Sequence, residues 1–196
     1  IIEQGMINLD NERERDRFFS WILDTFSKEV SSLGFGAADG AYYGARRNGD
    51  GIVIIRSDES TGGITWGYAL NEDYTAGELI LKADAYDPRT REWYIKAAAA
   101  GEPVYSSVYT RVISGERTVS AAHPVYDGAG HLLGVLSTHL LLDDLDVYLR
   151  DIVGQYSGVG LIAEEKTHDL IANSMGLPNQ AVLPDGTVQR YGVKDI

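Results

Sequence analysis

The sequence contains no cysteine, which excludes disulfide bonds, thiolate metal sites and a cysteine nucleophile. Basic residues are also scarce: 17 Lys and Arg stand against 29 Asp and Glu, which gives a net charge of −12. A field of this sign repels phosphates, so nucleic acid and an anionic membrane surface are excluded as partners. No stretch approaches the roughly 18 apolar residues that a membrane-spanning helix needs. The 196 residues suffice for one large domain, or for one domain and part of another.

Groups of residues that perform catalysis or hold metals are missing as well. The four histidines show no metal-ligand spacing, and the sequence has neither a glycine-rich phosphate loop nor a Gly-x-Ser-x-Gly elbow. Glu164 and Glu165 lie in a predicted polar turn, where nothing would raise a pKa for acid catalysis. The cluster of Asp143, Asp144 and Asp146 is typical of a solvated helix face rather than a metal site. The sequence therefore predicts a protein that is not an enzyme and that has no metal or cofactor.

Apolar residues recur at spacings of three and four in the N-terminal part, which predicts a long helix over residues 1–33. The apolar stripe consists of Phe19, Ile22, Leu23, Phe26, Val30 and Leu33. Gly34 and Gly36 are expected to end this helix. Two packing partners are consistent with this stripe: the chain's own sheet, which is favoured, or a second copy of the chain in a homodimer.

Strand patterns follow the helix. Aromatic and β-branched runs flank Asn-Gly and Asp-Gly pairs, which predicts a hairpin over residues 42–55. Residues 64–70 form a further short strand pattern, and three more strands are predicted at 104–113, 117–125 and 132–140. The hairpin and the last three strands, with a crossing helix between them, describe a five-stranded antiparallel sheet with helices packed on it; the looser stretch 64–70 is not counted in it. The predicted fold is α+β, of the PAS type.

The C-terminal part begins with a predicted helix over residues 141–153. Short strand patterns at 159–163 and 170–172 then flank a polar turn and indicate the opening hairpin of a second, smaller PAS-like module. The predicted organisation is a stalk helix at 1–33, a ligand-binding module at 34–153 and the start of a second module at 154–196. The abrupt ends of the chain indicate a piece of something longer.

Residues 86–94 read Tyr-Asp-Pro-Arg-Thr-Arg-Glu-Trp-Tyr and combine a turn signal, two guanidiniums and three aromatic rings. Asp87 can cap a helix whose first position is the following proline, and Gly101 suits the left-handed residue beyond its end. In such a helix Arg91 lies about 60° from Tyr94. A cation among rings suits a small anionic or zwitterionic ligand. The alternative is a surface arginine over a buried Trp-Tyr pair.

The sequence resembles the double Cache family of extracytoplasmic sensor domains. The resemblance is carried by residues 86–94, by Ser-Val-Tyr at 107–109, by Ala-His-Pro-Val-Tyr-Asp at 122–127 and by Gly-Val-Leu at 134–136. It implies a ligand-sensing ectodomain, periplasmic or extracellular, held between two transmembrane helices outside this chain. Such an ectodomain feeds a histidine kinase, chemoreceptor, cyclase or similar output.

The resemblance also implies a set of ligand-binding residues. Five positions match the family's amino-acid-binding motif, four that hold the ligand carboxylate and one later aromatic: Tyr86, Arg91, Trp93, Tyr94 and Tyr109. Two positions depart from the motif, because Arg111 and His139 stand where it has aspartates. Ser137 is assigned to the same set.

The missing aspartates would hold the ammonium group of an amino acid, and a charge-assisted hydrogen bond contributes roughly 1.5–3 kcal/mol. The expected ligand is therefore a small carboxylate or other anion without an obligatory amine. Arg91 would be its counter-ion, and Arg111 and His139 would add donors. The alternative function is a ligand-free structural or interaction module of a receptor, which relays signals from a partner protein. A secreted hydrolase is disfavoured for lack of paired catalytic groups.

Overall fold

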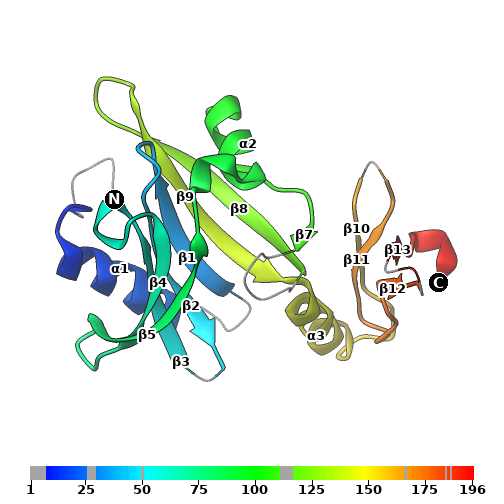
Figure 1. Cartoon of the computed structure of the whole chain (residues 1–196). Helices are drawn as coiled ribbons and strands as arrows, with labels where there is room; N and C mark the ends of the chain where they lie inside the picture. The colour runs from blue at the N-terminus through cyan, green and yellow to red at the C-terminus, as the bar shows by residue number, and fades with distance from the viewer. Residues whose placement is uncertain are drawn as a thin grey trace.

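The computed structural model describes residues 8–25, 30–49, 51–110, 117–165, 167–183, 185 and 187–196. A nine-stranded antiparallel sheet occupies its centre (Figure 1). The strands follow the order β5-β4-β3-β2-β1-β9-β8-β6, and β7 also pairs with β8. Their bounds are β1 Val30–Ala37, β2 Tyr42–Asn48, β3 Gly51–Ser57, β4 Ile64–Leu70, β5 Ala76–Ala85, β6 Val104–Tyr105, β7 Tyr109–Thr110, β8 Arg117–Tyr126 and β9 Leu132–Leu141.

Helix α1 spans Glu12–Thr25 and is shorter than the predicted helix over residues 1–33. Residues 30–37 form strand β1 instead, which pairs with β2 on one side and β9 on the other. The prediction was wrong because Val30 and Leu33 continue the helical spacing of the stripe, although the stretch that contains them is rich in glycine and can pair on both edges. Gly34 and Gly36 therefore lie inside a strand. Residues 1–7 and 26–29 lie outside the described part of the chain.

The apolar stripe of α1 packs on the chain's own sheet, as the sequence favoured. Phe19 and Leu23 are almost fully buried against Leu33, Phe35 and Val125. A homodimer through this helix stays a prediction.

Helix α2 (Glu92–Ala100) covers the opposite face of the sheet. Trp93, Tyr94 and Ala97 pack there on residues of β2, β3, β8 and β9, including Tyr42 and Val135. The antiparallel sheet and its order confirm the α+β prediction, but five strands were too few. Strand β5 was not predicted. Within the predicted strand 104–113, the described residues 104–110 contain the two short strands β6 and β7.

The C-terminal part begins with α3 (Leu142–Val153), where the sequence predicted a helix. Two small antiparallel ribbons follow, and their assignment to a second PAS-like module stays a prediction. The ribbons pair β10 (Leu161–Ala163) with β11 (Leu170–Asn173), and β12 (Gln180–Val182) with β13 (Val188–Arg190).

Asp146 does not lie on a solvated face as expected. Its carboxylate accepts from the Asn173 N–H at 2.6 Å and from Asn179 Nδ2 at 3.0 Å, so it ties α3 to the ribbons.

Among the described residues, no helix is long and apolar enough to cross a membrane.

The 3₁₀ turn η2 (Pro88–Thr90) packs on strand β1 at Gly36. A Cβ atom at this position would lie 2.6 Å from Pro88 Cβ and 3.0 Å from the Trp93 ring. We expect Gly36→Ala to lower the free energy of unfolding by about 1–3 kcal/mol, because backbone and a packed ring must move apart. Urea denaturation measures the effect. The control is Gly51→Ala, where the nearest heavy atom to a Cβ is 3.7 Å away; equal midpoints for the two variants would contradict this packing.

Candidate ligand-binding site

The junction between β5 and α2 does not form one continuous helix from Asp87. The Asp87 carboxylate accepts from the Arg89 N–H at 2.9 Å and caps η2, with Pro88 in its first turn. Arg91 is then extended (φ −91°, ψ 142°), and α2 begins only at Glu92. The predicted start was therefore wrong by five residues, since the capping signal serves the shorter turn. The predicted end is confirmed, because Gly101 is left-handed with φ 69°.

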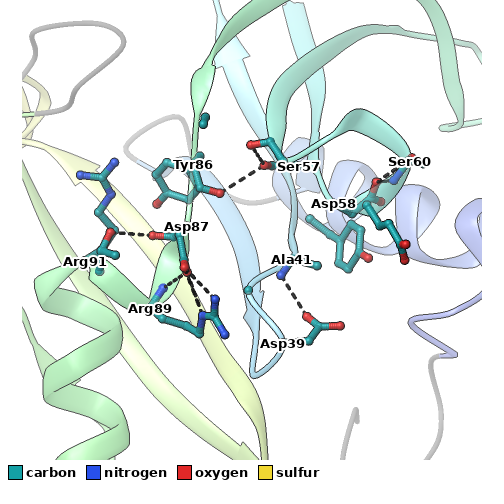
Figure 2. Close-up of a pocket in the computed structure, with 15 residues that line it drawn as sticks. Asp39, Ala41, Ser57, Asp58, Ser60, Tyr86, Asp87, Arg89 and Arg91 are labelled. Carbon is teal, nitrogen blue, oxygen red and sulfur yellow. Dashed lines mark hydrogen bonds and ion pairs between the residues drawn. The ribbon is translucent and has the colours of Figure 1, made fainter.

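This break in the helix decides where Arg91 points. Because Arg91 is not helical, its side chain does not share a helix face with Tyr94. It lies against Tyr86, with Cζ 4.8 Å from the ring centroid. In Figure 2 the guanidinium points away from Asp87 and lies alongside the Tyr86 ring.

The two arginines of this junction differ in how they are paired. Arg89 forms a bidentate ion pair with Asp87, with Nε–Oδ1 3.0 Å and Nη2–Oδ2 2.8 Å. These hydrogen bonds hold the pKa of Asp87 below its usual range. The Arg91 side chain is half-buried, its guanidinium has no hydrogen-bond or ion-pair partner among the described residues, and its Nε is fully buried. A guanidinium in this state is open to an anion from outside the chain.

A cavity of about 1000 Å³ opens beside this junction, where the β1–β2 turn, the end of β3 and the end of β5 meet (Figure 2). Of the predicted residues, Tyr86 and Arg91 line it. The rest of its wall comes from Asp39, Gly40, Ala41, Tyr43, Ser57, Asp58, Glu59, Ser60, Gly63, Ala85, Asp87, Arg89 and Thr90.

Three other predicted residues, Tyr109, Ser137 and His139, form a buried polar cluster under α2. The His139 Nδ1 lies 3.0 Å from the Tyr109 hydroxyl and 2.6 Å from Ser120 Oγ, and its Nε2 lies 3.2 Å from Ser137 Oγ. The Tyr109 hydroxyl is 2.9 Å from Ser120 Oγ. The ring of Trp93 meets the imidazole edge to face, with centroids 6.0 Å apart. Four predicted residues are thus brought into contact.

Trp93 and Tyr94 are 2% and 6% exposed, so both rings belong to the core beneath α2, as the alternative interpretation had it. Burial raises the pKa of Tyr94. Arg91, however, is not a surface arginine. Arg111 lies outside the described residues.

Two further residues of the site were missed by sequence reasoning. Ser120 was hidden in a strand pattern, although it follows Thr118 by two residues and therefore shares the inward face of β8. Tyr42 joins the two parts of the site. Its ring covers Gly34, whose carbonyl accepts from Ser137 Oγ at 3.5 Å, and it meets the Tyr86 ring edge to face at 5.0 Å.

The two carboxylates on either side of Arg91 in the sequence are already paired, whereas Asp39, Asp58 and Glu59 of the cavity wall form no ion pair among the described residues. Asp87 pairs with Arg89, and Glu92 accepts from Lys96 Nζ at 2.6 Å and from the Ser107 N–H at 3.1 Å. In the described part of the chain, no group of three or more His, Asp or Glu side chains could hold a metal ion. The arrangement therefore offers an unpaired cation beside Tyr86, hydroxyls, aromatic walls and, on the wall formed by the β1–β2 turn and the end of β3, three acids.

Comparison with known proteins shows which family this chain matches. Residues 48–147 match the family described as "Methyl-accepting chemotaxis protein-like, first PDC sensor domain". The chain belongs to this family. This chemoreceptor sensor domain is a ligand-binding, signal-transducing module and not an enzyme, as the sequence predicted, and the match agrees with the double Cache resemblance.

Individual proteins are similar to the chain over different lengths. The methyl-accepting chemotaxis protein McpA of Pseudomonas putida is 34% identical over 126 residues, which are 61% of this chain and 18% of McpA. The ligand-binding domain of Campylobacter jejuni chemoreceptor Tlp3, solved with 4-methylisoleucine, has a TM-score of 0.56 and 13% identity over 88% of this chain and 54% of that one. The domain of Pseudomonas aeruginosa chemoreceptor PctC, solved with GABA, has a TM-score of 0.50 and 21% identity over 87% and 61%. The chain thus spans only part of each relative.

Proposed function

We propose that this sensor domain binds a small organic carboxylate that needs no amine, with Arg91 as its counter-ion. The observation that carries the proposal is the half-buried guanidinium, which has a fully buried Nε and no partner among the described residues. Leaving a buried donor unsatisfied costs roughly 1–3 kcal/mol, and an anion in the site would remove that cost. The ligands named for Tlp3 and PctC, 4-methylisoleucine and GABA, both carry a carboxylate.

The amine preference is argued from the other end of the site. His139 stands where the family motif has an acid, and it is surrounded by hydroxyls. The described carboxylates nearby, Asp87 and Glu92, are neutralised by Arg89 and Lys96. In the His139 cluster and at the β5–α2 junction, an ammonium group would therefore find no unpaired acid among the described residues, whereas a carboxylate would find the Arg91 guanidinium. The acids of the cavity wall, Asp39, Asp58 and Glu59, come from the β1–β2 turn and the end of β3.

The remaining residues receive supporting roles in this proposal. Tyr86 holds the guanidinium by a cation–π contact, Trp93 and Tyr94 anchor the junction in the apolar core, and the hydroxyls of Tyr109 and Ser137 hold His139. The site lies in the membrane-distal module (34–153), and residues 154–196 open a membrane-proximal module. The whole receptor would hold this part outside the cytoplasm between two transmembrane helices beyond this chain.

A panel of matched ligands tests the proposal. Propionate, butyrate and 4-methylvalerate are compared with L-alanine, GABA and L-leucine by isothermal titration and thermal shift. A binding acid is expected to stabilise the fold by about 2.7 kcal/mol at a hundredfold excess over Kd. Each acid is expected to bind more tightly than its amino counterpart. The reverse order would contradict the carboxylate proposal, and no stabilisation by any compound would favour the alternative, a module that relays signals from a partner protein.

A further inference from the structure

The cavity beside Arg91 has a second polar wall, which a short carboxylate does not use. In Figure 2, Tyr86 and Arg91 lie on one side of the cavity, and Asp39, Asp58 and Ser60 lie on the other. The volume of about 1000 Å³ is at the upper end of the range for small-molecule sites. A ligand as short as propionate would leave most of this space to water. A larger ligand, with polar groups beyond its carboxylate, fills the cavity better.

Tyr43 on β2 is the aromatic residue of this second wall. Arg15 of α1 stacks on its ring, with Cζ 3.6 Å from the ring centroid, and this cation–π contact holds the ring in place. Arg15 is itself only 5% exposed, and its Nη1 donates to the Leu9 carbonyl at 2.9 Å. Burial raises the pKa of Tyr43, although Arg15 opposes the shift, so the phenol keeps its hydrogen at neutral pH. Its hydroxyl has no hydrogen-bond partner among the described residues and can both donate to a ligand and accept from one.

Three acids share this wall with Tyr43. Asp39 follows β1 in the chain, and Asp58 and Glu59 follow β3. One oxygen of Asp39 and one oxygen of Asp58 each accept a backbone N–H at 2.9 Å. The second oxygen of both residues and the carboxylate of Glu59 have no partner within the described part of the chain. The wall therefore presents several acceptors that lack a donor.

The groups of the second wall decide which part of a ligand can meet them. A second carboxylate would be repelled by the three acids. A keto oxygen could accept from Tyr43 but has no hydrogen for the acids, and an ammonium group has hydrogens for the acids but cannot accept from Tyr43. A hydroxyl does both, because it has one O–H donor and two lone pairs. Hydroxyl groups are therefore the best match for this wall.

We propose that the cavity takes a polyhydroxy carboxylate, such as a sugar acid, with its carboxylate at Arg91 and its hydroxyls at the second wall. The proposal rests on the proposed function, because it keeps Arg91 as the counter-ion. It adds Tyr43 as a specificity-determining residue, whose O–H donates to a ligand hydroxyl. That hydroxyl donates in turn to a carboxylate oxygen of Asp39, Asp58 or Glu59. None of these four residues belongs to the set that the family resemblance implies.

Pairs of acids with equal carbon numbers test the proposal on the intact chain by isothermal titration. The pairs are D-glycerate with propionate, threonate with butyrate, and D-gluconate with hexanoate. Gluconate is expected to bind at least about tenfold more tightly than hexanoate, because it gains a hydrogen bond to a charged acceptor. Three hexanoates that differ in the terminal group identify what the wall selects: 6-hydroxyhexanoate is expected to bind more tightly than adipate and 6-aminohexanoate.

Two variants assign the preference to the second wall. Tyr43→Phe removes only the hydroxyl and keeps the ring on Arg15, and it is expected to lower the ratio of gluconate to hexanoate affinity about tenfold. Asp58→Asn keeps the oxygen that accepts the backbone N–H but turns the other into a donor. It is expected to lower the same ratio and to strengthen the binding of adipate. The matched control is Tyr105→Phe, at a tyrosine that is 71% exposed and outside this cavity, which is expected to keep the wild-type ratio.

The outcomes separate this inference from the proposed function. Binding of gluconate no tighter than that of hexanoate, or an unchanged ratio in Tyr43→Phe, would overturn the role of the second wall and leave carboxylate binding at Arg91 intact. Tighter binding of 6-aminohexanoate than of 6-hydroxyhexanoate would overturn the preference for hydroxyls. Failure of every plain and hydroxylated acid to bind would remove both proposals. If Tyr43→Phe does not fold, the wild-type ratios and Asp58→Asn still decide the question.

Discussion

Replacing Arg91 with alanine is expected to remove carboxylate binding while leaving the fold nearly as stable as before. One lost charge-assisted hydrogen bond of roughly 1.5–3 kcal/mol corresponds to about 10- to 150-fold weaker binding. A guanidinium that holds both carboxylate oxygens contributes more. Arg91→Lys keeps the charge but loses the two-pronged geometry, so an intermediate affinity is expected.

The stability of the unliganded variant makes this prediction specific. Arg91 makes one cation–π contact, with Tyr86, and its buried Nε has no acceptor in the described part of the chain. Losing the contact costs about 0.5–1 kcal/mol, and removing the unsatisfied donor offsets part of that loss. The free energy of unfolding should therefore change by less than about 1 kcal/mol.

Arg13→Ala is the matched control for Arg91→Ala. It removes the same charge from an exposed site on α1, where Arg13 pairs with Asp73 at 2.9 Å, and is expected to leave the affinity for the acids unchanged. Titration calorimetry and thermal melts of both variants give the comparison. Wild-type affinity in Arg91→Ala would show that the carboxylate is held elsewhere. A large loss of stability with unchanged affinity would assign Arg91 to the scaffold.

Most of the order of strands and helices could be predicted from the sequence, because the local residue patterns agree with the fold. The hairpin of β2 and β3, the paired strands β8 and β9, and α3 each carry an apolar run or periodicity ended by turn residues. The predicted helix was wrongly extended over the residues of β1. A strand that is buried on both faces has apolar residues at any spacing, including a helical one. Alternation on β8 places Ser120 inward, but nothing local says that three hydroxyls converge on His139.

Only part of the candidate binding site could be predicted from the sequence, for a related reason. The resemblance gave Arg91 its role, but the helical geometry expected around it was wrong, since Asp87 caps a 3₁₀ turn and leaves Arg91 extended. Asp87 pairs with Arg89 and leaves Arg91 unpaired, although the two arginines are only two residues apart in the sequence. Only side-chain positions can show which of them is free.

An acid of α1 and an arginine of β3 form a buried ion pair. Asp16 and Arg56 are 4% and 6% exposed, and Arg56 Nη2 lies 3.2 Å from Asp16 Oδ2. The same carboxylate accepts from the Ala76 N–H at 3.3 Å, and Arg56 Nη1 reaches Glu12 at 2.9 Å. Burial raises the pKa of Asp16, and Arg56 opposes that shift. One carboxylate thus joins α1 to β3 and to the start of β5.

Asp16→Ala is expected to lower the free energy of unfolding by about 3 kcal/mol, measured by urea denaturation. Removing one partner of a buried pair costs roughly 3–5 kcal/mol, and the low end applies because Arg56 keeps Glu12. Replacing both partners, as Asp16→Leu with Arg56→Met, is expected to recover most of the loss, since a buried pair replaced by apolar side chains is often neutral. The control Asp73→Ala removes an exposed acid that also contacts α1 and should shift the midpoint far less.

The double replacement separates two accounts of how α1 is held. If the apolar pair restores stability, the charges add little to the docking of α1, which the packing of Phe19 and Leu23 then supplies. If the double variant is as unstable as Asp16→Ala, the hydrogen bond to Ala76 and the ion pair to Glu12 hold the helix, and the apolar stripe alone does not. A wild-type midpoint for Asp16→Ala itself would contradict the burial of this pair, because no folded arrangement leaves a desolvated guanidinium without cost.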